Sequence, residues 1–112
     1  MKNLQISYLM DFYGNLLNDK QQTVMQLYYG EDLSLAEIAS EVGITRQGVR
    51  DNILRAEKEL LQLEDALGLW KRFSRITSNL AKVRNMVKPN STITDEDYKL
   101  ITSLIDEVEN DV

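Results

Sequence analysis

The sequence of 112 residues contains neither cysteine nor histidine. Without cysteine the chain has no disulfide and no thiolate nucleophile. Without histidine it lacks the commonest metal ligand and the usual general base near neutral pH. We therefore expect a protein that is not an enzyme and that holds no metal or other cofactor. No apolar run reaches the ~18–20 residues that cross a bilayer, and the N-terminal stretch has no signal-peptide pattern, which favours a soluble, cytoplasmic protein.

Proline and glycine are also scarce, with one proline and five glycines in the chain. Apolar residues recur at spacings of three and four, and the strict alternation of a half-buried strand is nearly absent. This pattern predicts an all-α fold of about six helices. The expected helices cover residues 4–17, 19 to about 29, 35–42, 46–67, 69–87 and a last segment from 95 onward, after a loop that begins at residue 88.

Residues that stabilise helix ends mark most of these boundaries. Two pairs have the spacing of a capping box, Asn18 with Gln21 and Ser34 with Glu37. The two further N-caps that we expect are Thr45 and Thr94. Glycines are expected where helices end, because only glycine adopts the left-handed C-terminal conformation without steric cost; these glycines are Gly30, Gly43 and Gly68.

The stretch SLAEIASEVGITRQGVRDNI, residues 34–53, has the features of a helix-turn-helix. Ala39 is small enough for two helices to approach closely, and Gly43 tolerates the positive φ that the turn requires. Ile44 is expected to fill the corner between the helices, with Val49 and Ile53 buried one turn apart on the second helix. The sequence therefore predicts a helix-turn-helix here.

Charge is distributed in blocks, although the whole chain has a net charge of -5. Residues 69–90 hold six basic residues and no acidic residue, whereas residues 91–112 hold one basic and seven acidic residues. The block 34–68, which contains the helix-turn-helix, is net acidic. Because such asymmetry says more about partners than the total does, the helix 69–87 is the stronger candidate for binding phosphates.

Two groups of side chains are candidate nucleic-acid contacts. Arg46, Gln47 and Arg50 face outward in the first turns of the helix 46–67, where arginine and glutamine can bind base edges or phosphates. The second group suits the backbone of structured RNA and consists of Lys71, Arg72, Arg75 and Lys82. Three alternatives stay open: a solvated surface, an acidic protein partner, and pairing of the basic helix within the chain, either with the acidic last helix that masks it or with Glu59, Glu64 and Asp65.

Two apolar seams have the heptad spacing of four and three. The first runs through Val49, Ile53, Ala56, Leu60, Leu63 and Leu67, and the second through Leu69, Phe73, Ile76, Leu80, Val83 and Val87. One interpretation is an antiparallel hairpin in which the seams pack together across Gly68. The other is a seam that also recruits a second chain, giving a homodimer. A narrower stripe in the last helix comprises Tyr98, Ile101, Ile105 and Val108.

The residues from Leu16 to Leu60 resemble region 4 of bacterial sigma factors. With the flanking stretches FYGNLLNDKQ and RAEKELLQLEDALGL, residues 8–70 resemble the YlxM family, small helix-turn-helix proteins of Gram-positive bacteria. The resemblance implies an accessory factor of the signal recognition particle that associates with its RNA or its GTPase. It also adds the motif positions Thr45 and Asn52 to the candidate contacts.

We accordingly expect a sigma region 4-like helix-turn-helix domain over residues 1–68. Over residues 69–112 we expect a C-terminal basic helix with the acidic helix packed on it. The leading functional hypothesis is a non-enzymatic accessory protein of the signal recognition particle pathway, without membrane insertion. The alternatives are a sequence-specific DNA-binding transcriptional regulator and a protein–protein adaptor that uses the seams.

Overall fold

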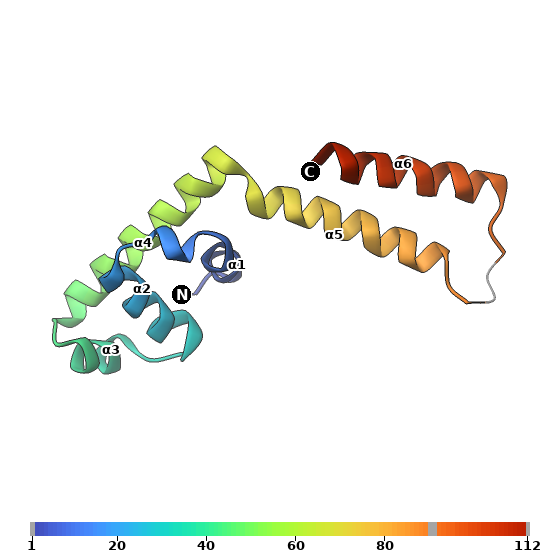
Figure 1. Cartoon of the computed structure of the whole chain (residues 1–112). Helices are drawn as coiled ribbons and strands as arrows, with labels where there is room; N and C mark the ends of the chain where they lie inside the picture. The colour runs from blue at the N-terminus through green and yellow to red at the C-terminus, as the bar shows by residue number, and fades with distance from the viewer. Residues whose placement is uncertain (1, 90–91, 112) are drawn as a thin grey trace. The chain divides into compact units, whose positions relative to one another are not determined.

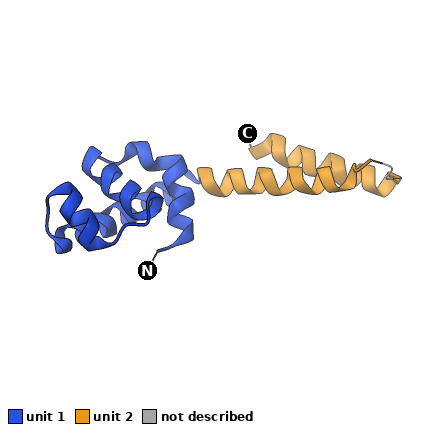
Figure 2. Cartoon of the chain, turned by 90° about the horizontal axis from the view of Figure 1, so that it is seen from below, with its two compact units in different colours: residues 1–68 blue, residues 69–112 orange. Residues whose placement is uncertain are grey.

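The computed structural model describes residues 2–89 and 92–111, and all regular structure within these ranges is helical (Figure 1). The prediction of an all-α fold with a helix-turn-helix is therefore confirmed. The chain divides into two compact units, residues 1–68 and residues 69–112 (Figure 2). Residues 90 and 91 of the expected loop lie outside the described residues.

The first unit begins with α1 (Leu4–Tyr13), which is shorter than the expected helix 4–17. A 3₁₀ segment η1 (Gly14–Leu16) follows, and Leu17 is extended. The physical reason is the next N-cap, because Asn18 must itself be extended (φ -68°, ψ 165°) to cap α2 (Asp19–Met25). The expected capping box of Asn18 and Gln21 is present, with both hydrogen bonds formed.

The second helix ends differently from the prediction. After Met25 the chain continues as a π-helical segment η2 (Gln26–Gly30), and the residue with positive φ is Asp32 (φ 57°), so the assignment of Gly30 as the left-handed helix terminus is wrong. Aspartate tolerates this conformation better than most residues do. Two contacts hold the turn there: the ion pair of Asp32 with Lys2, and the bond from Leu33 N to Leu27 O (3.0 Å).

The central element of the first unit is α4 (Arg46–Leu67), which contacts α1, α2 and α3. Its buried residues Val49, Ile53, Ala56 and Leu60 are the first four positions of the predicted seam. The helices around α4 contribute the fully buried side chains Ile6, Leu9, Tyr13, Val24, Met25 and Ile38. The predicted hairpin of the two seams is therefore wrong over Val49–Leu60, because helices of the same unit already cover that part.

The second unit is an antiparallel pair of helices, α5 (Leu69–Met86) and α6 (Asp95–Asp111) (Figure 1). The N-cap predicted at Thr94 is confirmed: Asp97 N donates to Thr94 Oγ1 (3.0 Å), and Thr94 N donates to the Asp97 carboxylate (3.1 Å). The acidic first turn of α6 also complements the positive end of the helix dipole.

The faces by which α5 and α6 meet are rotated from the predicted ones. Of the predicted seam, Ile76 and Val83 are half-buried, while Leu69, Phe73 and Leu80 of α5 and Val87 just after it are exposed; the buried residue of α5 is Asn79. On α6 the buried residue is Leu104; of the predicted stripe, Ile101 and Val108 are half-buried, whereas Tyr98 and Ile105 are exposed. A polar contact accompanies this rotation: Asn79 Nδ2 donates to Glu107 Oε2 (2.9 Å) between the helices.

No helix within the described ranges 2–89 and 92–111 has the length and apolar character needed to span a membrane. The same part of the chain has no cluster of three or more acidic side chains placed to hold a metal ion. The aspartates at the start of α6 act at the helix end instead, where Asp97 takes part in the Thr94 cap.

Candidate nucleic-acid interface

The helix-turn-helix consists of α3 (Leu35–Val42), the turn 43–45 and α4. The Ser34 side chain accepts from Glu37 N (3.1 Å), and the Glu37 carboxylate accepts from Ser34 N (3.0 Å), as the predicted capping box requires. This bond to the Ser34 backbone lowers the pKa of Glu37. Thr45 begins α4 as predicted, since its Oγ1 accepts from Gly48 N (2.9 Å).

The turn between α3 and α4 has a backbone that the sequence specifies. Gly43 is left-handed (φ 74°), as predicted, and both Gly43 N (3.0 Å) and Ile44 N (3.2 Å) donate to Ala39 O. Ile38, Ala39 and Val49 are buried, and Ile44 is half-buried at the corner. The turn is thereby held from the backbone and from the core, which fixes the direction in which α4 leaves α3.

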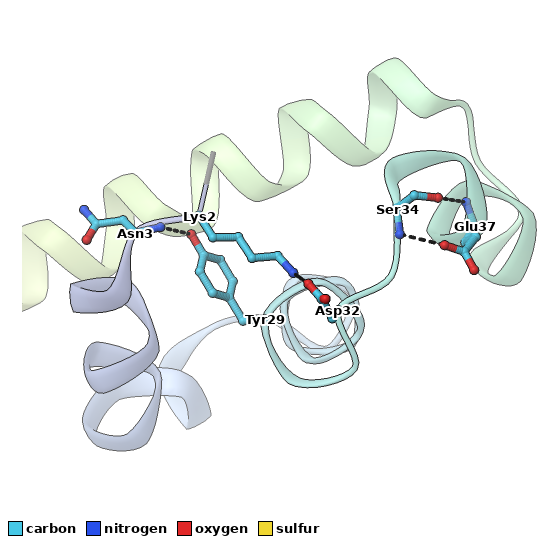
Figure 3. A network of polar contacts seen from close by, with 6 residues as sticks. All are labelled: Lys2, Asn3, Tyr29, Asp32, Ser34 and Glu37. Carbon is cyan, nitrogen blue, oxygen red and sulfur yellow. Dashed lines mark hydrogen bonds and ion pairs between the residues drawn. The ribbon is translucent and has the colours of Figure 1, made fainter.

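A polar network links the N-terminus to the segment before α3 (Figure 3). Lys2 pairs with Asp32 and lies 4.7 Å from the centre of the Tyr28 ring. Asn3 N donates to the Tyr29 hydroxyl (3.4 Å), which in turn donates to the carboxylate of Glu57 on α4. Burial raises the pKa of Tyr29, and the hydrogen bond to Glu57 raises it further as the second-largest cause. The network thus connects the N-terminal residues Lys2 and Asn3 to η2 and to α4.

The outer surface of α4 carries part of the predicted contact set. Arg46, Gln47 and Arg50 are exposed, and Gln47 Nε2 donates to Asp51 Oδ1 (2.9 Å) one turn away. The hydroxyl of Thr45 is occupied by its cap. Asn52 is half-buried and its Oδ1 is buried. The structure therefore brings the two arginines and Gln47 to the surface, but not the side-chain oxygen of Asn52.

Two further residues extend this surface and were not among the predicted contacts. Leu54 and Lys58 are exposed. They continue the helical face of Gln47 and Asp51, since Leu54 follows Asp51 by three residues and Lys58 follows Leu54 by four. Their exposure could be predicted from the length of the helix, because the outer face that begins with Arg46, Gln47 and Arg50 continues along α4 as one strip of exposed residues. Lys58 adds a positive charge to this strip.

Three of the four predicted basic residues of α5 line one groove of about 450 Å³. Lys71, Arg75 and Lys82 line it, whereas Arg72 is not among its lining residues. The remaining lining residues are one aromatic and several polar side chains: Trp70, Ser74, Ser78 and Asn79. Three cations beside an indole ring and hydroxyl groups form a surface suited to phosphates and to stacking on a base.

Arg75 of this groove has a partner on α6. Arg75 binds Asp111 of α6 in a bidentate manner, through Nη2 to Oδ1 (2.8 Å) and Nε to Oδ2 (3.2 Å). The bond lowers the pKa of Asp111 and raises the pKa of Arg75. A bidentate guanidinium–carboxylate pair has the geometry with which arginine also binds phosphate. Asp111 therefore occupies the position that a phosphate would take on Arg75.

The helix-turn-helix of α3 and α4, together with the basic helix α5, defines a helix-turn-helix protein with an additional basic helix. The chain belongs to the YlxM/p13-like helix-turn-helix family UPF0122, whose family model matches residues 1–103. The predicted resemblance to the YlxM family is thereby confirmed.

Several UPF0122 proteins are similar to this chain over most of its length. The protein of Bacillus pumilus is 46% identical over 103 residues, which cover 92% of this chain and 93% of the relative. That of Shouchella clausii is 42% identical over 108 residues, covering 96% and 94%. That of Desulforamulus reducens is 47% identical over 83 residues, covering 74% and 71%.

Replacing Gly43 with alanine is expected to lower the free energy of unfolding by about 1–2 kcal/mol, because alanine pays the steric cost of the left-handed backbone. An added Cβ at Gly43 meets nothing within 4 Å, so the loss comes from backbone strain alone. Urea denaturation measures the change. Gly30→Ala is the matched control, since that residue does not have positive φ; its stability should stay constant or rise by up to ~1 kcal/mol. Equal losses of unfolding free energy in both variants would contradict the left-handed conformation of Gly43.

Proposed function

We propose that this protein is a non-enzymatic accessory factor of the signal recognition particle pathway that binds structured RNA. The observation that carries the proposal is the groove on α5, where Lys71, Arg75 and Lys82 lie together beside Trp70. The net-acidic surroundings of the helix-turn-helix favour α5 over α4 as the main phosphate-binding surface. The link to the targeting particle comes from the resemblance of the chain to its family.

The proposed binding is mainly to the RNA backbone. The grooves of an RNA duplex display phosphates and 2′-hydroxyls rather than readable base edges, so binding depends on shape and charge. Lys71 and Lys82 supply point charges, and Arg75 supplies a planar fork that matches a phosphate. Ser74 and Ser78 add hydroxyl donors on the same side of the groove. The GTPase of the particle is a further proposed partner.

Binding at this groove would also involve α6. A phosphate that binds Arg75 replaces the Asp111 carboxylate, so that the acidic helix competes with RNA for the same guanidinium. The charge blocks suggest that the acidic helix masks the basic helix. In this hypothesis the masking contact is the pair of Arg75 and Asp111. The competition is expected to weaken at high salt, because the pair lies at an exposed position of Arg75.

A sequence-specific DNA-binding regulator is the second candidate function. The observation that favours it is the exposure of Arg46, Gln47 and Arg50 at the start of α4, where recognition helices bind base edges. In that function the α4 surface, and not the groove of α5, would carry the sequence-dependent part of the affinity.

Co-purification from native cell extract distinguishes these functions. The full chain should carry RNA of the targeting particle, its GTPase, or both, when bound nucleic acid is sequenced and bound protein is identified by mass spectrometry. Treating the extract with ribonuclease shows whether the GTPase is held through RNA. Recovery of promoter DNA, without RNA or GTPase of the particle, would overturn the proposal and support the regulator.

A further inference from the structure

Eight large apolar side chains among the described residues of the second unit stay exposed although α5 and α6 pack together, and four of them lie at two matching levels of the helix pair. Leu80 and Val87 of the α5 segment are each 48% exposed, and Tyr98 and Ile105 of α6 are 68% and 39% exposed. Apolar side chains grouped on one face of a helical pair mark an interaction surface. The question is whether these four residues form one face.

The register of the helix pair places the four residues at two levels along its axis. Arg75 meets Asp111, and Asn79 meets Glu107, so four residues forward along α5 correspond to four residues back along α6. Continuing this register places Leu80 level with Ile105, and Val87 level with Tyr98, each to within about one residue rise of 1.5 Å. The four side chains therefore form two rungs across the pair.

The direction of these side chains follows from the helical rotation of 100° per residue. Leu80 and Val87 are turned by roughly 60° from the face of α5 that meets α6, in the direction in which the chain advances. Tyr98 and Ile105 are turned by roughly 80° from the inner face of α6, also in the direction of the chain. Because the helices are antiparallel, these rotations lead to the same side, and the two rungs make one apolar face.

The groove of α5 lies on the other side. Arg75 and Lys82 are turned from the inner face of α5 in the opposite direction to Leu80, by a similar angle. Leu100 of α6, which is 51% exposed, is also turned to that other side. A partner on the apolar face would therefore leave the basic groove open, and the two surfaces can be tested separately.

Charges along the two edges of the apolar face identify its partner. Arg84 and Lys88 lie beyond Leu80 and Val87 on the α5 edge, and Asp106 and Glu109 lie beyond Ile105 on the α6 edge; all four are exposed. A nucleic acid would oppose the acidic edge, and a partner of one charge sign would match only one edge. A second copy turned by a two-fold axis parallel to the helices places each α5 over the partner's α6, and Arg84 then lies within about four residue rises, roughly 6 Å along the axis, of the level of Asp106 in the second copy.

We propose that the face formed by Leu80, Val87, Tyr98 and Ile105 binds the same face of a second copy of this chain. The four helices then form an antiparallel bundle in which the apolar rungs lie inside and the basic and acidic edges meet along both sides. The first units and the groove lined by Arg75 and Lys82 are not required for this association.

The oligomeric state of the full chain tests the proposal. Sedimentation velocity should give a dimer that dissociates on dilution. The variant Leu80→Glu/Ile105→Glu should be monomeric at the same concentrations, with its helix content checked by circular dichroism. Leu100→Glu is the matched control, because it places the same charge at an exposed apolar position on the other side; this variant should stay dimeric. A wild-type chain that is monomeric at all concentrations, or a dimer that survives the double substitution, would overturn the proposal.

Charge reversal tests the orientation of the two copies. The variants Arg84→Glu/Lys88→Glu and Asp106→Lys/Glu109→Lys should each self-associate roughly tenfold more weakly than the wild type, because like charges then meet along the edges. Mixed in equal amounts, the two variants should form a heterodimer, since the acidic edges of one copy meet the basic edges of the other. If the mixture associates no better than either variant alone, α5 does not lie over the partner's α6.

Discussion

Replacing Lys71, Arg75 and Lys82 together with alanine is expected to weaken the binding of structured RNA and to flatten its dependence on salt. Each phosphate contact contributes roughly 0.9 to the slope of log affinity against log salt. Three lost contacts should therefore lower that slope by about two to three units. Fluorescence anisotropy with particle RNA, measured over a series of salt concentrations, gives both quantities.

Two further variants make this result specific. Arg46→Ala/Arg50→Ala removes two exposed cations from α4 and should change RNA affinity less than the triple substitution does. Asp111→Asn removes the negative charge that pairs with Arg75 and should strengthen RNA binding, most clearly at low salt. If the α4 pair causes the larger loss, and the loss depends on DNA sequence, the regulator is favoured over the RNA-binding function.

Truncating Leu60 to alanine is expected to lower the free energy of unfolding of the first unit by about 2–5 kcal/mol. The Leu60 side chain is fully buried on α4, the helix that contacts α1, α2 and α3. Its removal loses both the transfer free energy of the apolar atoms and the contacts around the cavity that remains. Because small domains have total stabilities of about 5–15 kcal/mol, this change alone threatens the folded state.

Leu61→Ala is the control for this prediction, since the adjacent leucine is 42% exposed on the same helix. Both substitutions exchange leucine for alanine in one helix turn, so their difference in helix propensity cancels. Chemical denaturation monitored at 222 nm by circular dichroism should show a loss below ~1 kcal/mol for Leu61→Ala. Similar losses for the two variants would show that α4 does not bury Leu60 in the way the structure indicates.

The helix-turn-helix was predictable from the sequence almost to the residue, because its determinants are local. A capping box needs two side chains three residues apart, and a left-handed turn needs glycine at one position. Ser34, Glu37, Gly43 and Thr45 meet these requirements within one short stretch, and all four act as predicted. The periodicity that predicted the burial of Val49 and Ile53 is likewise a property of one helix.

The faces of α5 and α6 were not predictable in the same way. Both helices carry more apolar positions than a two-helix pair can bury, so periodicity gave a broad stripe without a centre. Of the predicted seam, Ile76 and Val83 are half-buried while Phe73, Leu80 and Val87 are exposed, because the interface is centred near Asn79, which bonds Glu107. A polar residue at the interface outweighs a small gain in apolar area, because its amide is buried and needs a hydrogen-bond partner.

The candidate binding surfaces show the same division. Arginines and lysines could be assigned to the exposed sides of α4 and α5 from spacing alone. That Lys71, Arg75 and Lys82 share a groove while Arg72 does not, and that Asp111 reaches Arg75 from 36 residues away, depends on how α6 packs. The same holds for Asp32, whose left-handed backbone is stabilised by Lys2 across 30 residues of chain.

The sequence by itself determined the all-α class, the helix boundaries at Asn18, Ser34, Thr45 and Thr94, and the block of positive charge on α5. Each of these depends on residues within a turn or two of one another. Only the tertiary structure decided which faces of the paired helices meet, which side of α5 remains apolar and that Asp111 is the partner of Arg75. Each of these outcomes depends on contacts between distant segments. The free-energy differences between alternative packings are small relative to what either helix gains by folding.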